Sequence, residues 1–182
     1  MQKNMQQKWE FHLEKCQNNM EIRYATMQDL ANVAAVEWEC FPPAEAATAE
    51  SFQERLRYFP NHFWLLFVDG KLVSFVDGMV TNLPDLTDEM YEKADMHDEN
   101  GAWQMIFGVN TIPSCRNRGY AGMLLKKAIE DAKNQGRKGL VLTCKAEKVS
   151  YYEKFGFVKE CLSESTHGGA VWYQMRLAFT EK

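Results

Sequence analysis

The stretch from Trp103 to Gln135, WQMIFGVNTIPSCRNRGYAGMLLKKAIEDAKNQ, constrains the fold more than any other part of the chain. It begins with a mostly apolar run, Met105 to Ile112, and continues into a turn, Arg116 to Gly122, that carries two arginines and two glycines. Beyond the turn, small and aliphatic residues recur at the i, i+3, i+4, i+7 spacing of a buried helical stripe. Gly136 then stands where a glycine typically ends a helix. The sequence therefore predicts a strand, a glycine-bearing turn and a helix in direct succession.

This order of elements can bind phosphate, because the first turn of a helix carries unpaired N–H groups and a partial positive charge. Gly119 and Gly122 allow the backbone to approach an anion closely, and Arg116 and Arg118 add full positive charges. The same order also occurs in purely structural crossovers, so that alternative stays open. The chain contains neither G-x-x-x-x-G-K-[ST] nor G-x-G-x-x-G, which excludes a P-loop and disfavours a dinucleotide-binding fold.

Two motifs in this chain resemble those of a known family. The segment RNRGYA, from Arg116 to Ala121, matches the Q/R-x-x-G-x-G/A signature of the GCN5-related N-acetyltransferases, and YYEKFGF, from Tyr151 to Phe157, resembles their Y-x-x-x-G-F segment. Two motifs in the family's order are more specific than either alone. The resemblance runs from Glu21 to Leu177 and is greatest to the arylalkylamine (serotonin-type) branch. That narrower likeness is carried by Ile22 to Phe41, by LFVDGKLVSFVDG and by LTC ahead of SYYEKFGF.

The resemblance implies an α/β fold with a mixed, mostly antiparallel central sheet, helices on both faces, and a splayed parallel pair of strands at the acetyl-CoA site. Residue patterns agree with several parts of this fold. Thr26 and Thr48 are placed to cap the first two helices, and Asp69-Gly70 between two β-prone runs predicts a hairpin. Gly139 to Cys144 is typical of a buried parallel strand. The last predicted strand, Ala170 to Leu177, alternates so that its odd-numbered residues are expected to be buried.

The resemblance also implies the site. In the family, free backbone groups of the splayed central strand bind the pantetheine arm, and here they belong to Val109, Asn110 and Thr111, with the Val109 N–H as the oxyanion donor. Tyr152 matches the tyrosine that protonates the coenzyme A thiolate, a role that suits a phenol with a pKa near 10. A buried structural tyrosine, or a shift of the role to Tyr151, stays open. The pyrophosphate would lie on the turn, with the arginines assisting: Arg116, Asn117, Arg118, Gly119, Tyr120, Ala121 and Gly122.

The acceptor side is less well defined by the residues. Phe41, Pro42 and Pro43 lie at the break between the first two helices and are candidates for a wall against an apolar or aromatic substrate, together with Phe107; the alternative is a rigid connection. Serotonin-type enzymes carry two strand histidines at the positions of Met105 and Phe107, which puts the general base in doubt. Direct transfer needs no cysteine nucleophile. Side chains that could order a water to take the proton are Glu37, Glu39, Glu45, Asp77 and Gln104.

Composition limits the partners and the setting. The net charge of −4 and the pI near 5.6 argue against a nucleic-acid partner, which would need a basic face. The acidic segment from Asn82 to Asn100 is typical of a solvated face and could also steer an ammonium substrate. Five cysteines without a C-x-x-C pair predict neither a disulfide framework nor a zinc site. Reduced cytoplasm is the expected setting, and no apolar run approaches the ~20 residues of a membrane span.

Taken together, these features predict an amphipathic extension over residues 1–20 and an acetyltransferase domain over 21–182. The expected function is direct transfer of an acetyl group from acetyl-CoA, without a metal, to a primary amine of a small, aryl-alkyl type of substrate. Two alternatives stay open: a protein or peptide amine as the acceptor, and a non-catalytic module that binds acetyl-CoA. No membrane partner is expected, and the protein is expected to be a monomer or a homodimer.

Overall fold

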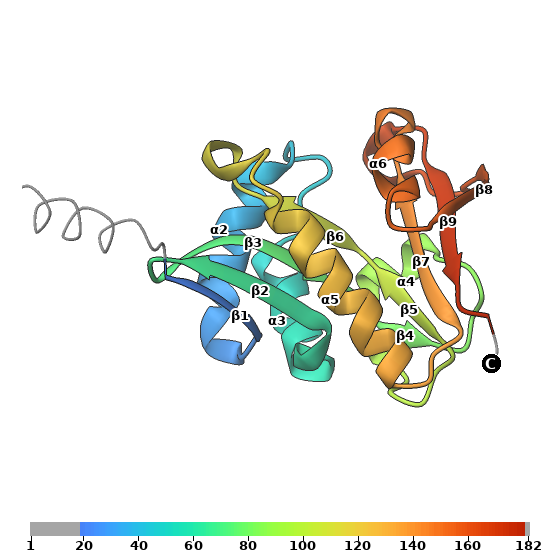
Figure 1. Ribbon diagram of the computed structural model, residues 1–182, viewed down its shortest axis with the longest axis horizontal. Helices are drawn as coiled ribbons and strands as arrows, with labels where there is room; N and C mark the ends of the chain where they lie inside the picture. Colours follow the sequence, from blue (N-terminus) through green and yellow to red (C-terminus); the bar gives the residue numbers. More distant parts are fainter. Residues whose placement is uncertain (1–18, 181–182) are drawn as a thin grey trace, which may run out of the picture.

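The strands form two sheets (Figure 1). The computed structural model describes residues 19–180, and within them the first sheet has the strand order β1-β2-β3-β6 and the second β4-β5-β7-β9-β8. The strands of the first sheet are β1 Met20–Tyr24, β2 Phe63–Val68, β3 Lys71–Asp77 and β6 Gly108–Thr111. Those of the second are β4 Val80–Thr81, β5 Trp103–Ile106, β7 Gly139–Cys144, β8 Val158–Leu162 and β9 Tyr173–Ala178.

Most neighbouring strands are antiparallel, and one pair is parallel. In the first sheet β1 pairs with β2, β2 with β3 and β3 with β6, each antiparallel. In the second sheet β5 and β7 are parallel, whereas β4, β8 and β9 join their neighbours in antiparallel fashion. This arrangement confirms the expected mixed, mostly antiparallel sheet with one parallel pair.

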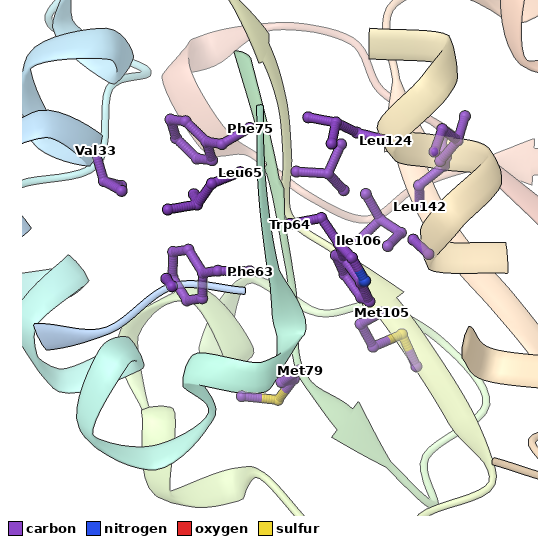
Figure 2. Packing of buried hydrophobic residues seen from close by; sticks show 14 of the residues in the cluster. Val33, Phe63, Trp64, Leu65, Phe75, Met79, Met105, Ile106, Leu124 and Leu142 are labelled. Carbon is purple, nitrogen blue, oxygen red and sulfur yellow. The ribbon is translucent and has the colours of Figure 1, made fainter. Parts of the chain in front are cut away.

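Helices cover both faces of the first sheet. The helices are α2 Leu30–Cys40, α3 Ala49–Tyr58, α4 Asp88–Glu92, α5 Tyr120–Asn134 and α6 Val149–Glu153. Figure 2 shows Phe63 and Phe75 on the side of Val33 in α2, whereas Trp64 lies on the side of Leu124 in α5. Alternate residues of a strand point to opposite faces, so the apolar runs of β2 and β3 supply two buried layers. None of the helices in residues 19–180 has the length and apolar character to cross a membrane.

Several local predictions are confirmed. The Thr26 backbone N–H donates to Asp29 Oδ2 at 2.8 Å, as in a capping box, and Thr48 Oγ1 accepts a hydrogen bond from the Ser51 N–H at the start of α3. Asp69 and Gly70 both have positive φ angles, of 50° and 78°, as a two-residue hairpin turn between β2 and β3 requires. The cap positions and the turn are predictable from the sequence because each depends on a few adjacent residues.

Other predictions are corrected by the structure. The central strand is interrupted at Phe107, and the last strand begins at Tyr173 rather than Ala170. Its expected alternation is wrong: Val171 lies before the strand and is 65% exposed, whereas Gln174 is buried and its amide donates to Asp85 and to Glu160 of strand β8. Asp131, expected on the polar face of α5, is buried. The expected extension over 1–20 lies outside the described residues except for its last two positions.

Candidate active site

The chain passes from one sheet to the other at Phe107. Strand β5 pairs in parallel with β7 up to Ile106 and Leu142, and β6, which follows after Phe107, pairs with β3 instead. Figure 1 shows β6 and β7 running apart beyond this junction. The splayed parallel pair expected from the sequence is therefore present.

The backbone of β6 offers hydrogen-bonding groups to this opening. The Ile112 N–H donates to the Val73 carbonyl at 3.0 Å, so Ile112 and Val73 form a hydrogen-bonded pair. Asn110 and Gly108, two and four residues earlier, lie opposite Phe75 and Asp77 of β3 in the same kind of pair. Hydrogen-bonded pairs alternate in an antiparallel ladder, so Val109, opposite Val76, directs its N–H and C=O away from β3. The side of β6 away from β3 is the side on which β7 has separated. This orientation is what the predicted pantetheine and oxyanion roles of Val109 require.

The turn before α5 has the backbone of an anion-binding loop. Asn117 and Gly119 have positive φ angles of 62° and 83°, and Gly119 is the N-cap residue of α5. Alternation of right- and left-handed residues turns successive N–H groups toward one point, and the helix N-terminus adds its partial positive charge. The Arg116 Nε donates to the Thr111 carbonyl at 3.1 Å, which ties the turn to the end of β6.

A cavity of about 590 Å³ joins this turn to the opening between β6 and β7. It is large enough for a substantial part of a nucleotide cofactor, and its wall includes both the turn and the splayed strand. The predicted residues on its wall are Phe41, Pro42, Phe107, Val109, Thr111, Arg116, Asn117, Gly119, Tyr120, Ala121, Gly122 and Tyr152. Three predicted residues, Pro43, Asn110 and Arg118, do not line it; the Asn110 side chain is buried against Glu37.

Tyr151 and Tyr152 both lie on the wall of this cavity, and Tyr152 is the more buried of the two. Tyr152 is buried, and burial raises its pKa above the ordinary value for a phenol, so the hydroxyl keeps its proton at neutral pH. The hydroxyl of Tyr151 lies 3.7 Å from where a Cβ on Gly122 would stand, at the first turn of α5. Burial raises the pKa of Tyr151 as well, so both phenols keep their protons at neutral pH.

Burial also raises the pKa of Cys144, on the same wall, to about 11. A thiol that stays protonated at neutral pH is a poor nucleophile. This environment agrees with direct transfer rather than an acyl-cysteine intermediate.

A second cavity, of about 380 Å³, meets the first. The residues common to both walls are Phe41, Glu45, Phe107, Thr143 and Trp172. The second cavity is strongly acidic, since five carboxylates and one arginine line it: Glu37, Glu45, Asp77, Asp88, Glu92 and Arg55. Opposite charge in a confined space favours a cationic ligand.

The innermost ionic pair of this second cavity is formed by Arg55 and Asp77. The Arg55 Nη1 donates to Asp77 Oδ2 at 3.1 Å, and the Arg55 Nη2 donates to the Tyr91 carbonyl. The Arg55 guanidinium also lies 4.9 Å from the ring centre of Phe107. Burial raises the pKa of Asp77 to about 7; the positive charge of Arg55 opposes this shift, and the negative charge of Glu37 adds to it.

Three of the five sequence candidates for the base, Glu37, Glu45 and Asp77, line the second cavity. Glu39 lines neither cavity. Gln104 is buried in a structural network: its Nε2 donates to the carbonyls of Met79 and Met105.

His62, His97 and Glu99 are the only group within residues 19–180 whose potential metal ligands lie close together. Their atoms are engaged with one another instead. The Val80 N–H donates to His97 Nδ1 at 3.1 Å, so the proton of a neutral His97 is on Nε2, which faces Glu99 Oε2 at 3.1 Å. Arg137 adds a positive charge 3.0 Å from the other Glu99 oxygen. This arrangement is suited to hydrogen bonding rather than to a dication.

Comparison with known proteins gives the family. The model of the acetyltransferase (GNAT) family matches residues 29–157, which is well over half of the chain. The chain belongs to the GNAT family. Members of this family bind acetyl-CoA or coenzyme A, and the turn, the splayed strands and the first cavity fit such a ligand. No curated protein matches the chain in sequence.

Solved GNAT-like structures share the fold at low identity. The loading GNATL domain of CurA from Lyngbya majuscula has a TM-score of 0.76 and 17% identity, over 88% of this chain and 98% of that one. The ribosomal-protein-S18-alanine N-acetyltransferase from Escherichia coli has 0.67 and 17%, over 90% and 96%. Arabidopsis thaliana Naa50, in complex with the bisubstrate analogue CoA-Ac-MVNAL, has 0.68 and 14%, over 88% and 99%.

Sequence reasoning missed several wall residues of this GNAT site. Lys145 donates to both carboxylate oxygens of Glu45, at 2.7 and 3.0 Å, and its Nζ lies 5.5 Å from the ring centre of Trp172. Tyr91 lies on the second cavity, with its hydroxyl 3.5 Å from Thr143 Oγ1. These residues come from segments with no motif, so only the three-dimensional fold brings them together.

Proposed function

We propose that this GNAT protein transfers an acetyl group directly from acetyl-CoA to a primary amine. The observation that carries the proposal is the junction of two unlike cavities at Phe107. One cavity has an anion-binding turn and Tyr152 on its wall, as the coenzyme requires, and the other is lined by carboxylates, as an ammonium group requires.

The roles of the residues follow from their positions. The backbone amides of residues 117–122 would bind the pyrophosphate, assisted by Arg116 at the edge of the first cavity. The Val109 N–H, directed away from β3, would donate to the oxygen that becomes negative during acyl transfer. Tyr152, which keeps its proton, would donate it to the departing thiolate. Acetyl-CoA supplies the thioester acetyl group.

For the acceptor, we favour a small amine with an aromatic or apolar body. The second cavity has about 380 Å³, and Phe41, Tyr91, Phe107 and Trp172 supply aromatic surface around its carboxylates. An ammonium group is attracted both by carboxylates and by aromatic faces. The comparisons do not reach the level of the arylalkylamine branch, so an aryl-alkyl amine is proposed on the strength of this lining alone. Met105, at one of the two positions of the branch's histidines, is fully buried in the core.

A peptide amine is the second candidate. The Escherichia coli structure is named for an alanine of ribosomal protein S18, and the Naa50 structure contains an analogue with the peptide MVNAL. Both share this fold, although at identities of 17% and 14% they speak only for the fold. A peptide would have to enter the same acidic cavity with its N-terminus first.

The test is release of free thiol from acetyl-CoA with a panel of amines, namely phenethylamine, tryptamine, polyamines and short peptides. Turnover with aryl-alkyl amines alone is the expected result, and turnover with peptides alone would replace the small acceptor by the second candidate. If no amine of the panel is acetylated although calorimetry detects binding of acetyl-CoA, the proposed catalysis is overturned in favour of a binding module. A chain that does not bind acetyl-CoA would contradict the assignment of the first cavity.

A further inference from the structure

One carboxyl group of the second cavity stands beside the backbone that the acyl transfer would use. Asp77 is the last residue of β3 and lies opposite Gly108, the residue before Val109. The Phe107 N–H donates to the Asp77 carbonyl at 2.8 Å, which holds the interruption between β5 and β6 against this end of β3. Asp77 is therefore one residue away, across the sheet, from the predicted oxyanion donor.

The interruption at Phe107 opens this position to the cavity. Adjacent residues of a regular strand point to opposite faces, yet Phe107 and Gly108 both line the second cavity. A Cβ on Gly108 would stand only 2.8 Å from Asp77 Oδ1, so any other residue there would press against the carboxyl group. Asp77 is 1% exposed, but the glycine leaves its Oδ1 next to the cavity wall.

Three of the other four carboxylates of the cavity accept hydrogen bonds from fixed donors. Glu37 accepts from the Ala47 N–H and from the Asn110 side chain, and Glu45 is paired with Lys145. Asp88 accepts from the Thr166 N–H and from the Ser165 hydroxyl. Glu92 is exposed at the edge of the cavity. Asp77 is the most buried of these carboxyl groups, it has an arginine as its charged partner, and it lies opposite the residue before Val109.

The groups that face Asp77 favour a change of protonation near neutrality. Arg55 from α3 forms an ion pair with Asp77 and the Gly108 backbone N–H donates a hydrogen bond to its carboxyl group, and both favour the ionised form. Glu37 from α2 repels a negative charge, and Tyr91 adds an uncharged phenol. Burial raises the pKa of Asp77 to about 7. A base works best when its pKa is close to the working pH, because it is then both available and strong enough.

We infer that Asp77 is the base that takes the proton from the acceptor's ammonium group. This inference rests on the proposed function. The ammonium group gives one proton to Asp77, and the lone pair set free forms the C–N bond to the acetyl carbon. The C–S bond breaks, Tyr152 gives its proton to the thiolate, and the proton that the new amide nitrogen loses restores Tyr152. Asp77 then releases its proton to water, so that ammonium and thioester become amide, thiol and one proton.

The variant that tests the inference is Asp77→Asn, which keeps the size of the side chain and removes the base. We expect kcat/KM at pH 7 to fall by about 100-fold, the order expected of a general base. The affinity for acetyl-CoA should stay the same, because Asp77 lies outside the first cavity. The variant should recover at alkaline pH, where the amine loses its proton in solution near pH 10. Asp95→Asn, an exposed acid of the same region that lines neither cavity, is the matched control.

A second variant separates a base from a structural ion pair. The wild type should gain activity with pH through an inflection near 7, because only ionised Asp77 accepts a proton. Arg55→Gln removes the positive charge that favours the ionised form, so the inflection should move to higher pH by about one unit. A role of Asp77 in folding alone would leave the inflection where it is, and that result in Arg55→Gln would overturn the inference even if Asp77→Asn does not fold.

The role of Asp77 and the acetyltransferase activity are tested by different outcomes. An active wild type whose Asp77→Asn variant keeps its rate and its inflection would reject Asp77 as the base and leave the acetyltransferase intact. A wild type that acetylates no amine would overturn the proposed function, and the role of Asp77 with it.

Discussion

At the scale of single residues, the hydroxyl of Tyr152 is expected to act in the chemistry and not in binding. Tyr152→Phe removes one oxygen from a buried ring whose packing against Phe157 can remain. We expect kcat to fall by about 100-fold, as for loss of a general acid, with the dissociation constant for acetyl-CoA unchanged. Steady-state rates and calorimetry measure the two quantities. Tyr151→Phe is the control, and equal losses in both variants would mean that the acid has been assigned to the wrong residue or does not exist.

Single residues also show where sequence reasoning reaches its limit. Tyr152 and the turn residues could be named in advance because each stands in a short motif. Arg55 stands in no motif; helical spacing places it beside Phe52 and Leu56, and it is buried, whereas the Arg57 side chain is 61% exposed. What the spacing does not show is the partner of the buried charge, Asp77, which lies on another element. A buried charge depends on such a partner, and partners are a property of the fold.

At the scale of an element, the N-terminus of α5 is expected to depend on the backbone of Gly119. Its φ of 83° is unfavourable for residues with a side chain, although no atom lies within 4 Å of an added Cβ. Gly119→Ala should therefore cost about 1 kcal/mol of stability and, by distorting the turn, weaken acetyl-CoA binding about tenfold.

The other end of the same helix offers the control for this variant. Gly136 has a φ of 73° and equally open surroundings, so Gly136→Ala should cost similar stability without changing the affinity for acetyl-CoA. Urea unfolding and calorimetry on both variants separate the two effects. Equal affinities in the two variants would show that the turn does not bind the coenzyme.

Helix α5 also shows why its polar face was only partly predictable. The spacing of its apolar residues placed the buried stripe correctly, with Leu124, Leu125 and Ala128 in the core. The same spacing predicts Asp131 on the polar face, yet it is 7% exposed because it accepts hydrogen bonds from Trp64 Nε1 at 2.8 Å and from the Tyr24 hydroxyl at 2.9 Å. Periodicity identifies the apolar side of a helix, but it does not report which polar groups find partners on neighbouring strands.

At the scale of the whole molecule, Glu99 links the two sheets. His62, immediately before β2 of the first sheet, meets Glu99 Oε2 at 3.0 Å, and Arg137, close before β7 of the second sheet, donates to Oε1 at 3.0 Å. His62 Nδ1 also faces the Gln104 Oε1 of β5 at 2.7 Å. Since the Gln104 amide nitrogen donates to two carbonyls, its oxygen is the acceptor and His62 Nδ1 carries a proton.

This arrangement predicts a pH-dependent contribution to stability. Burial alone would raise the pKa of Glu99, but the hydrogen bonds from His62 and His97 and the positive charge of Arg137 outweigh it and hold the pKa below the ordinary value. A carboxylate with a lowered pKa stabilises the folded state above its unfolded pKa, near 4.3, and this contribution is lost as the pH falls through the folded pKa. Glu99→Gln should therefore lower the free energy of unfolding at pH 7, and the deficit should shrink as the pH falls below about 4.

The loss of unfolding free energy in Glu99→Gln at pH 7 depends on the histidine and arginine groups that lose Glu99 as their partner. Glu99 is 59% exposed on its side chain, so the deficit should be about 1–2 kcal/mol, at the low end for a hydrogen-bonded charge whose partners are buried. Urea unfolding of the wild type and of Glu99→Gln at pH 7 and at pH 3.5 measures this deficit. The control is Glu89→Gln, which loses only an exposed pair with Lys93 and is expected to change the free energy of unfolding by less than about 0.5 kcal/mol. A deficit that is the same at both pH values would show that Glu99 acts through packing and not through its charge. The two sheets would then be joined mainly by the apolar core and by the chain that crosses between them at Phe107.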